Sequence, residues 1–132
     1  MVENSLLDKR QIMETIHTLT IPFSSYNGIL EARQRALVLD NQHFSVGDVL
    51  ILNPFDSVLD CYMNYDATDH TFHPGSKDKV LLASGIIVEV TNITATNLEE
   101  TKLISIVPIK HFLRRHAILA QAENERTKEL VH

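Results

Sequence analysis

The chain has almost none of the residues from which a disulfide framework or a cysteine-based zinc cluster is built. Its 132 residues include one cysteine, Cys61, so both are excluded. A single thiol is typical of proteins from a reducing compartment. Aspartates flank Cys61, and negative neighbours suppress the thiolate form. We therefore interpret Cys61 as a packed core residue and not as a nucleophile.

Long apolar runs are also missing. Uninterrupted runs such as residues 49–52 and 80–83 are far shorter than the roughly 20 residues that cross a bilayer. The opening residues Met-Val-Glu-Asn-Ser lack the basic and then apolar pattern of a signal peptide. The sequence therefore predicts a cytoplasmic protein with no membrane partner.

Glycine is too rare for the loops that bind phosphates or dinucleotides. The four glycines, at positions 28, 47, 75 and 85, are too widely spaced for either motif. Neither Gly-x-Ser-x-Gly nor His-Glu-x-x-His occurs, and no Ser, His and Asp spacing indicates a triad. We expect a protein that uses no cofactor and is not an enzyme.

Charge is unevenly distributed along the chain. The net charge is −5, which argues against a general polyanion binder. Residues 36–76 contain six aspartates and no lysine or arginine, whereas residues 101–122 contain four basic residues and no acid. A chain of this dipolar kind can bind an anion locally or associate with a second copy of itself.

The apolar pattern changes period twice and predicts an α+β fold. Residues 5–20 fit a helix capped by Ser5, with an apolar stripe at Ile12, Ile16 and Leu19. Short apolar segments separated by turn residues then predict about five to six strands, curled into a small sheet or pseudo-barrel. Residues 56–78 form the longest irregular region, with room for another strand around residues 59–65. The single domain therefore comprises an N-terminal helix (1–24), a β core (25–110) and a C-terminal helix (111–132).

Basic and aromatic residues supply candidate contacts to RNA. On a helix beginning near Lys110, that residue and Arg114 share one face, with Arg115 on the adjoining stripe. Arg33 and Arg35 form a second basic pair. Aromatic side chains could stack on bases, and the candidates are Tyr26, Phe44, Tyr62, Tyr65 and Phe72.

His70 and His73 are the best candidates for metal ligands. Asp66 and Asp69 lie close to them in the sequence, and imidazole with carboxylate suits zinc or a similar ion. Pro74 follows at once and indicates a loop, where this spacing does not bring the two rings together. A solvated surface loop explains the same residues, and we predict no metal there.

Residues 37–52, Leu-Val-Leu-Asp-Asn-Gln-His-Phe-Ser-Val-Gly-Asp-Val-Leu-Ile-Leu, resemble the core of PUA-like domains, particularly the ASCH group. Those domains have a strand, a polar turn, a Val-Gly-Asp step and a second strand in this order, followed by a hairpin similar to residues 85–94 and 103–109. The resemblance covers about residues 25–110. It implies a PUA-like fold and RNA as the partner.

The chain departs from the ASCH pattern at the ligand cleft. ASCH domains usually have a Glu-x-Arg pair before the polar turn, and here those two positions are Ala36 and Val38. The resemblance therefore supports the fold and not the enzymatic activity of some ASCH proteins. Chain length and flanking helices also resemble PrgU-like proteins, small PUA-fold regulators of pheromone-responsive conjugative plasmids. That similarity implies control of a surface adhesin or transfer factor at the RNA level.

Three hypotheses follow from the sequence. The first is a non-catalytic PUA-like regulator that binds RNA. The second is a small-ligand or metal-binding protein, or an enzyme, that uses residues 56–78. The third is a protein-interaction module or homodimer, in which the acidic middle of the chain meets its basic region.

Overall fold

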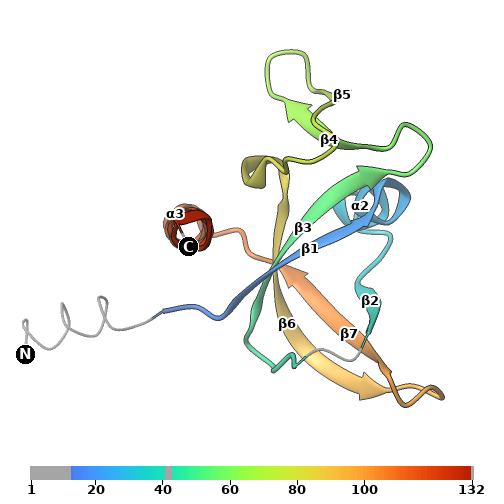
Figure 1. Ribbon diagram of the computed structural model, residues 1–132. Coiled ribbons are helices and arrows are strands. Elements are labelled where there is room, and N and C mark those ends of the chain that lie inside the picture. The colour runs from blue at the N-terminus through green and yellow to red at the C-terminus, as the bar shows by residue number, and fades with distance from the viewer. Residues whose placement is uncertain (1–12, 41–42, 132) are drawn as a thin grey trace, which may run out of the picture.

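The computed structural model describes residues 13–40 and 43–131 (Figure 1). Within these ranges the chain forms seven strands, two α-helices and one 3-10 turn. In chain order they are β1 (Ile16–Pro22), α2 (Phe23–Leu30), β2 (Ala36–Asp40), β3 (Val49–Asp56), β4 (Cys61–Asp66), β5 (Thr71–Pro74), η1 (Leu82–Ser84), β6 (Ile86–Ala95), β7 (Thr101–Pro108) and α3 (Phe112–Val131).

The strands form one sheet in the order β2-β7-β6-β3-β4-β5, and β1 pairs with β3. The β1–β3 pair is parallel and all the others are antiparallel. The predicted α+β class is therefore confirmed. Between the described residues of β1 and β2 no pairing closes the sheet, so the sheet is open over these residues and the expected pseudo-barrel is not seen in them.

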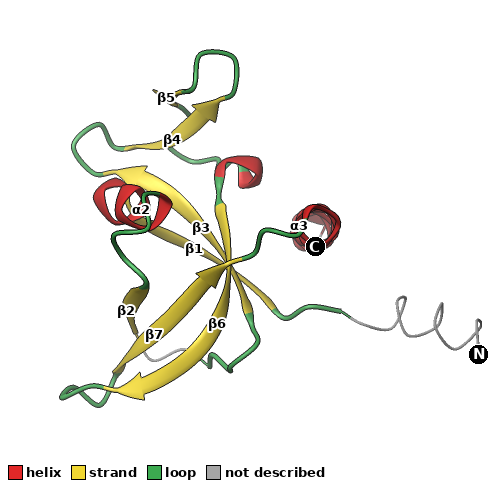
Figure 2. Cartoon of the chain, turned by 180° about the vertical axis from the view of Figure 1, so that it is seen from behind, coloured by secondary structure: helices red, strands yellow, loops and turns green. Residues whose placement is uncertain are grey.

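Strand β3 is buried on both faces and organises the core. Leu50 and Leu52 pack in a cluster with Tyr26 of α2. Val49 and Ile51 point the other way and pack in a second cluster with α3. Because successive side chains of a strand alternate between its faces, the continuous apolar run 49–52 requires a cover on each side. Helices α2 and α3 lie on opposite sides of the sheet and supply the two covers (Figure 2).

Polar contacts fix α3 to the chain that enters β1. The Arg114 guanidinium donates from Nε to Glu14 Oε2 at 2.8 Å and from Nη1 to Glu89 Oε1 at 2.7 Å. Gln121 donates from Nε2 to the Glu14 carbonyl oxygen at 2.6 Å. Beneath these contacts Ile118 is fully buried. The predicted C-terminal helix is confirmed, and its orientation is set by contacts between residues 100 and 107 positions apart in the sequence.

The predicted N-terminal helix is wrong over residues 16–20, which belong to β1. Leu19 and Ile21 are more buried than Thr18 and Thr20, an alternation of period two that a strand produces. β-branched residues are frequent in this segment and favour a strand beside β3. The first α-helix of the described chain is instead α2, which begins after Pro22. The expected cap at Ser5 lies outside the described residues.

The strand expected around residues 59–65 is present as β4, and the rest of the predicted irregular region 56–78 contains a second strand, β5, that was not predicted. Strands β4 and β5 form a hairpin within it, with Asn64 paired to His73 and Tyr65 paired to Phe72. Asp56 and Asp66 accept hydrogen bonds from backbone N–H groups that follow them, which closes the turns at either end of β4. The segment therefore presents its aromatic side chains from a defined sheet edge.

Burial of Ile118 predicts a large effect on stability. Ile118→Ala leaves a cavity between α3 and the sheet and should lower the free energy of unfolding by about 2–5 kcal/mol. Leu113→Ala, on the same helix but 69 % exposed, should change it by less than about 0.5 kcal/mol. Urea denaturation measures both, and equal effects would contradict this packing of α3.

Candidate functional site

Two adjoining hollows form one groove beside the start of α3. The larger, about 480 Å³, includes Tyr65 and Phe72 in its lining and is called the aromatic hollow. The smaller, about 260 Å³, includes Arg35 and is called the Arg35 hollow. The two share four lining residues, and together we name them the Lys110 groove. The shared residues are Ile29, Ala32, Pro108 and Lys110.

An aromatic cluster forms one wall of the aromatic hollow. The Phe72 ring lies 5.4 Å from the Tyr26 ring at 88° and 5.3 Å from the Tyr65 ring at 62°, both edge-to-face. Such contacts restrict the rings and stabilise the cluster beyond simple burial. Tyr65 is 42 % exposed, so it presents aromatic surface to a ligand.

Ser84 connects this wall to the floor of the hollow. The Tyr26 hydroxyl donates to the Ser84 carbonyl oxygen at 2.7 Å, and the Tyr65 N–H donates to Ser84 Oγ at 3.1 Å. Burial raises the pKa of Tyr26 from 10.0 to about 12, and the positive charge of Arg115 offsets part of that rise. The Tyr26 hydroxyl therefore keeps its proton and its donor role near neutral pH.

The charged residues that line the groove are all basic. Lys110 borders both hollows, Arg115 borders the aromatic hollow and Arg35 borders the other. Arg115 donates from Nη1 to the Ile109 carbonyl oxygen at 3.0 Å, which fixes the guanidinium beside the hollow. Among the described residues, no aspartate or glutamate lines either hollow. On a chain of net charge −5, the groove is thus a local concentration of positive charge.

Two of the five predicted cations make ion pairs within the protein. Arg114 bonds Glu14 and Glu89, and these hydrogen bonds raise the pKa of its guanidinium above the usual range. Arg33 Nε lies 2.8 Å from a carboxylate oxygen of Glu31. Neither arginine lines the groove in the described part of the chain. The structure thus brings together Lys110, Arg115 and Arg35 and gives Arg114 a structural role.

The predicted stacking residues form two groups, since Tyr26, Tyr65 and Phe72 line the groove and, within the residues that the structure describes, the others do not. Tyr26 lines the groove but is only 4 % exposed. Phe44 packs edge-on against His17 at 4.8 Å, and Tyr62 packs against Phe55 at 5.2 Å. Neither Phe44 nor Tyr62 lines the hollows that the described residues form. The side chains placed to meet a ligand are those of Tyr65 and Phe72.

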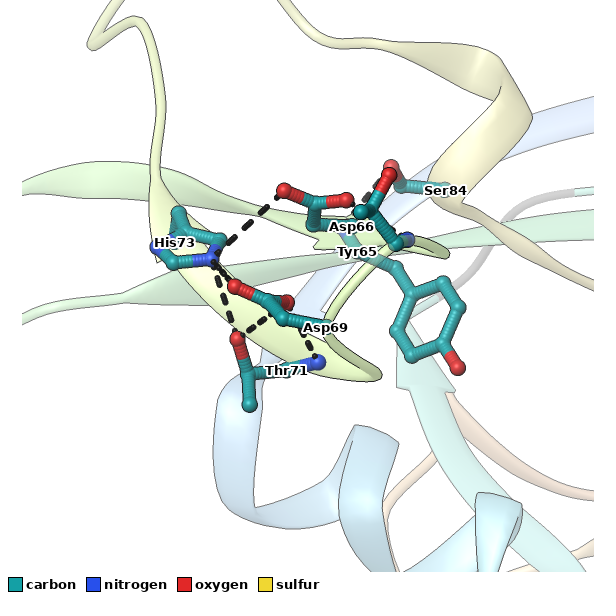
Figure 3. A network of polar contacts seen from close by, with 7 residues as sticks. Tyr65, Asp66, Asp69, Thr71, His73 and Ser84 are labelled. Carbon is teal, nitrogen blue, oxygen red and sulfur yellow. Dashed lines mark hydrogen bonds and ion pairs between the residues drawn. The ribbon is translucent and has the colours of Figure 1, made fainter.

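The two candidate metal-ligating histidines make different contacts in the β4–β5 hairpin, and Figure 3 shows the His73 side with Asp66 and Asp69. His70 Nδ1 lies 3.0 Å from the Tyr65 hydroxyl. His73 Nε2 instead lies 2.8 Å from Asp69 Oδ2 and 3.8 Å from Asp66 Oδ2. One ligand-type atom from each of Asp66, Asp69 and His73 falls within 4.8 Å of the others. A metal set from this hairpin would thus include one histidine, not the predicted pair.

Turn formation accounts for the two aspartates. Asp66 accepts from the N–H of Thr68 at 2.8 Å, and Asp69 accepts from the N–H of Thr71 at 3.0 Å. The bond from Thr68 lowers the pKa of Asp66 below 3.8, and the hydroxyl of Thr71, followed by His73, lowers that of Asp69. The carboxylates therefore stabilise the hairpin that carries Tyr65 and Phe72.

Sequence reasoning missed Ser84, Ile29 and Pro108 as groove residues. Their side chains belong to no motif, and only the fold brings them beside Lys110. Gly85, placed within an apolar run, was the available signal. An added Cβ there would lie 2.6 Å from Ile51 Cγ2, so this position requires glycine at the groove floor.

No protein-family model matches the chain, and no curated protein matches it either. Among the described residues, neither helix combines the length and hydrophobicity of a membrane crossing.

Because the hydroxyl of Tyr26 is buried and hydrogen-bonded, we expect its removal to lower the stability of the protein. Tyr26→Phe leaves the Ser84 carbonyl without this donor and should lower the free energy of unfolding by about 1–3 kcal/mol. Tyr62→Phe is the matched control, because the bond of its hydroxyl to Thr20 is exposed to solvent, and it should cost less than about 0.5 kcal/mol. Thermal denaturation of both variants decides, and a smaller loss for Tyr26→Phe would contradict the assignment.

Because of the carboxylates of Asp66 and Asp69, we expect the stability of the hairpin to depend on pH in the acidic range. Their pKa values are lowered by folding, so their contribution is present above the unfolded pKa and is lost as the pH falls through the lower, folded values. Carboxyl titration by NMR should place both below 3.8. His73→Ala should raise the pKa of Asp69, whereas His70→Ala should leave it unchanged. The reverse result would contradict the hydrogen-bonding pattern of the turn.

Proposed function

We propose that the Lys110 groove binds single-stranded RNA and that the protein is a non-catalytic RNA-binding regulator. One observation carries the proposal, namely a groove that combines aromatic surface with three basic residues and, among described residues, no acid. Single-stranded nucleic acid is recognised by this combination, because bases stack on aromatic rings while phosphates contact the basic side chains.

The aromatic hollow suits a single unstacked base. Its volume of about 480 Å³ lies within the range of pockets that take small planar ligands. Tyr65 and Phe72 offer ring surface, and a base stacked there contributes about 1–3 kcal/mol. The buried Ser84, at 6 % exposure, supplies a polar group at the floor.

The arrangement of charge suits a short backbone segment. Lys110 lies where the two hollows meet, with Arg115 on one side and Arg35 on the other. A strand that follows the groove would pass three cations in succession. Since the rest of the chain is acidic, binding depends on these local contacts and not on overall attraction.

A PUA-like domain remains our proposal for the family. The Val-Gly-Asp step supports it, because Gly47 has a φ of +96° and the Asp48 carboxylate accepts the N–H of Ser45 at 3.0 Å, which forms a tight turn before β3. From the separate similarity of chain length and flanking helices to PrgU-like proteins, we propose that the regulated transcript encodes a plasmid-borne adhesin or transfer factor.

A small anionic ligand is the second candidate function. The aromatic hollow is large enough for a mononucleotide and has its own cation, Arg115. The two candidates differ in the use of the Arg35 hollow, which a mononucleotide in the aromatic hollow would not need.

The test is RNA binding by the wild type and two matched variants. Lys110→Glu/Arg35→Glu should weaken binding of a ten-nucleotide oligouridine by about tenfold or more, since it removes phosphate contacts. Lys128→Glu, an exposed charge reversal in the last turn of α3, should leave affinity nearly unchanged. For three phosphate contacts on a single strand, the logarithm of the binding constant should fall against the logarithm of salt with a slope of about −2.

Capture from a lysate of the source cells, with and without RNase, then identifies the target. A discrete transcript retained by the wild type and lost in Lys110→Glu/Arg35→Glu supports the regulator. A slope near zero, or equal affinity of both variants, would overturn RNA binding at this groove. Tight binding of a mononucleotide that is insensitive to Arg35→Glu would favour the second candidate.

A further inference from the structure

A pair of exposed rings lies at the start of α3, next to the Lys110 groove. The Phe112 and His116 ring centroids are 6.3 Å apart and the rings are inclined by 24°. Phe112 is 75 % exposed, and His116 is also exposed. Neither side chain belongs to the two core clusters of the described chain. A stacked i, i+4 pair stabilises a helix only slightly, so packing within the protein gives little reason for a phenylalanine in water.

Helix geometry places this pair beside the cationic border of the groove. Positions 112, 115 and 116 are neighbours on a helix surface, because residues three and four apart lie on adjoining turns. Arg115, between the two rings in sequence, lines the aromatic hollow, and Lys110 immediately precedes the helix. A ligand leaving the aromatic hollow past Arg115 therefore meets the ring pair next.

The charge around the pair favours an anionic partner. The first turn of α3 contains no acidic residue, and the basic stretch 101–122 contains none at all. An exposed apolar patch beside cations indicates a binding surface. A flat pair of rings matches the face of a nucleobase, whereas the acidic segment of a second copy would offer carboxylates to the cations and little to the rings.

We propose that Phe112 and His116 form a second stacking platform, which binds a base of the same RNA strand outside the Lys110 groove. This inference rests on the proposed RNA binding. It extends the site from the groove to the first turns of α3, and it explains why Phe112 is exposed beside Lys110. The platform contributes only when the strand is long enough to leave the groove.

Substitution of Phe112 tests the platform with two lengths of RNA. For a ten-nucleotide oligouridine, Phe112→Ala should weaken binding by about 5- to 150-fold, the range that one stacked base supplies. For a dinucleotide, which occupies the groove alone, it should change affinity less than twofold. Leu113→Ala is the matched control, since Leu113 is 69 % exposed on a neighbouring stripe of the same helix, and it should affect neither ligand.

Phe112→Trp gives a direct readout of stacking. The chain contains no tryptophan, so this variant has a single indole whose fluorescence reports its own environment. We expect the ten-nucleotide RNA to quench it and to bind with near wild-type affinity, while the dinucleotide leaves the emission unchanged. Leu113→Trp should show no comparable quenching with either RNA.

The outcomes separate this inference from the proposed function. If the wild type binds neither RNA, the proposed function fails and the platform fails with it. If the wild type binds both and Phe112→Ala weakens neither, RNA binding stands and the platform is overturned. If Phe112→Ala instead abolishes a dimer seen by analytical ultracentrifugation and leaves RNA affinity unchanged, a second copy covers the rings and the inference is wrong.

Discussion

The structure depends on the burial of β3 from both sides. Residues 49–52 have no exposed surface, and their side chains alternate between a core closed by α2 and a core closed by α3. A single covering layer would leave the side chains on one face of this strand in water. Each large side chain left exposed would lower the free energy of unfolding by about 1.5–3 kcal/mol. The chain therefore supplies one helix before the central strands and another after them. The remaining strands extend the sheet from this centre.

The groove follows from that arrangement. The two helices cover opposite faces, and residues of α2 and of the start of α3 line the same hollow beside Pro108, where β7 ends. The β4–β5 hairpin closes the same region with Tyr65 and Phe72. A site at the junction of several elements can change its lining residues without disturbing β3, and ligand sites commonly occupy such junctions.

Much of the framework could be predicted from the sequence, because the responsible signals are local. The apolar run 49–52 and the uninterrupted helix-forming composition after Pro108 each indicated their element. The helix prediction for residues 16–20 is wrong because Ile16 and Leu19 fit the apolar stripe of a helix as well as the pattern of a strand. The parallel pairing with β3, which decides between the two, is long-range. The site was predicted only in part for a related reason. Arg114 and Arg115 are neighbours in sequence, but one residue turns a helix by about 100°, which directs Arg114 to Glu14 and Arg115 to the groove.

The contacts of carboxylates elsewhere in the fold explain how an acidic chain can present a basic groove. Glu14 and Glu89 form ion pairs with Arg114, and Asp48 and Asp69 form hydrogen bonds with His17 and His73. These pairs hold carboxylates in turns and at the base of α3, away from the groove lining. The negative surplus disfavours a polyanion over much of the surface, whereas the groove gathers the three cations Lys110, Arg115 and Arg35, which favour an anionic ligand there. In the proposed function, affinity comes from contacts that require unstacked bases. We therefore expect the groove to select flexible single strands over duplexes, whose bases are not available to Tyr65 and Phe72.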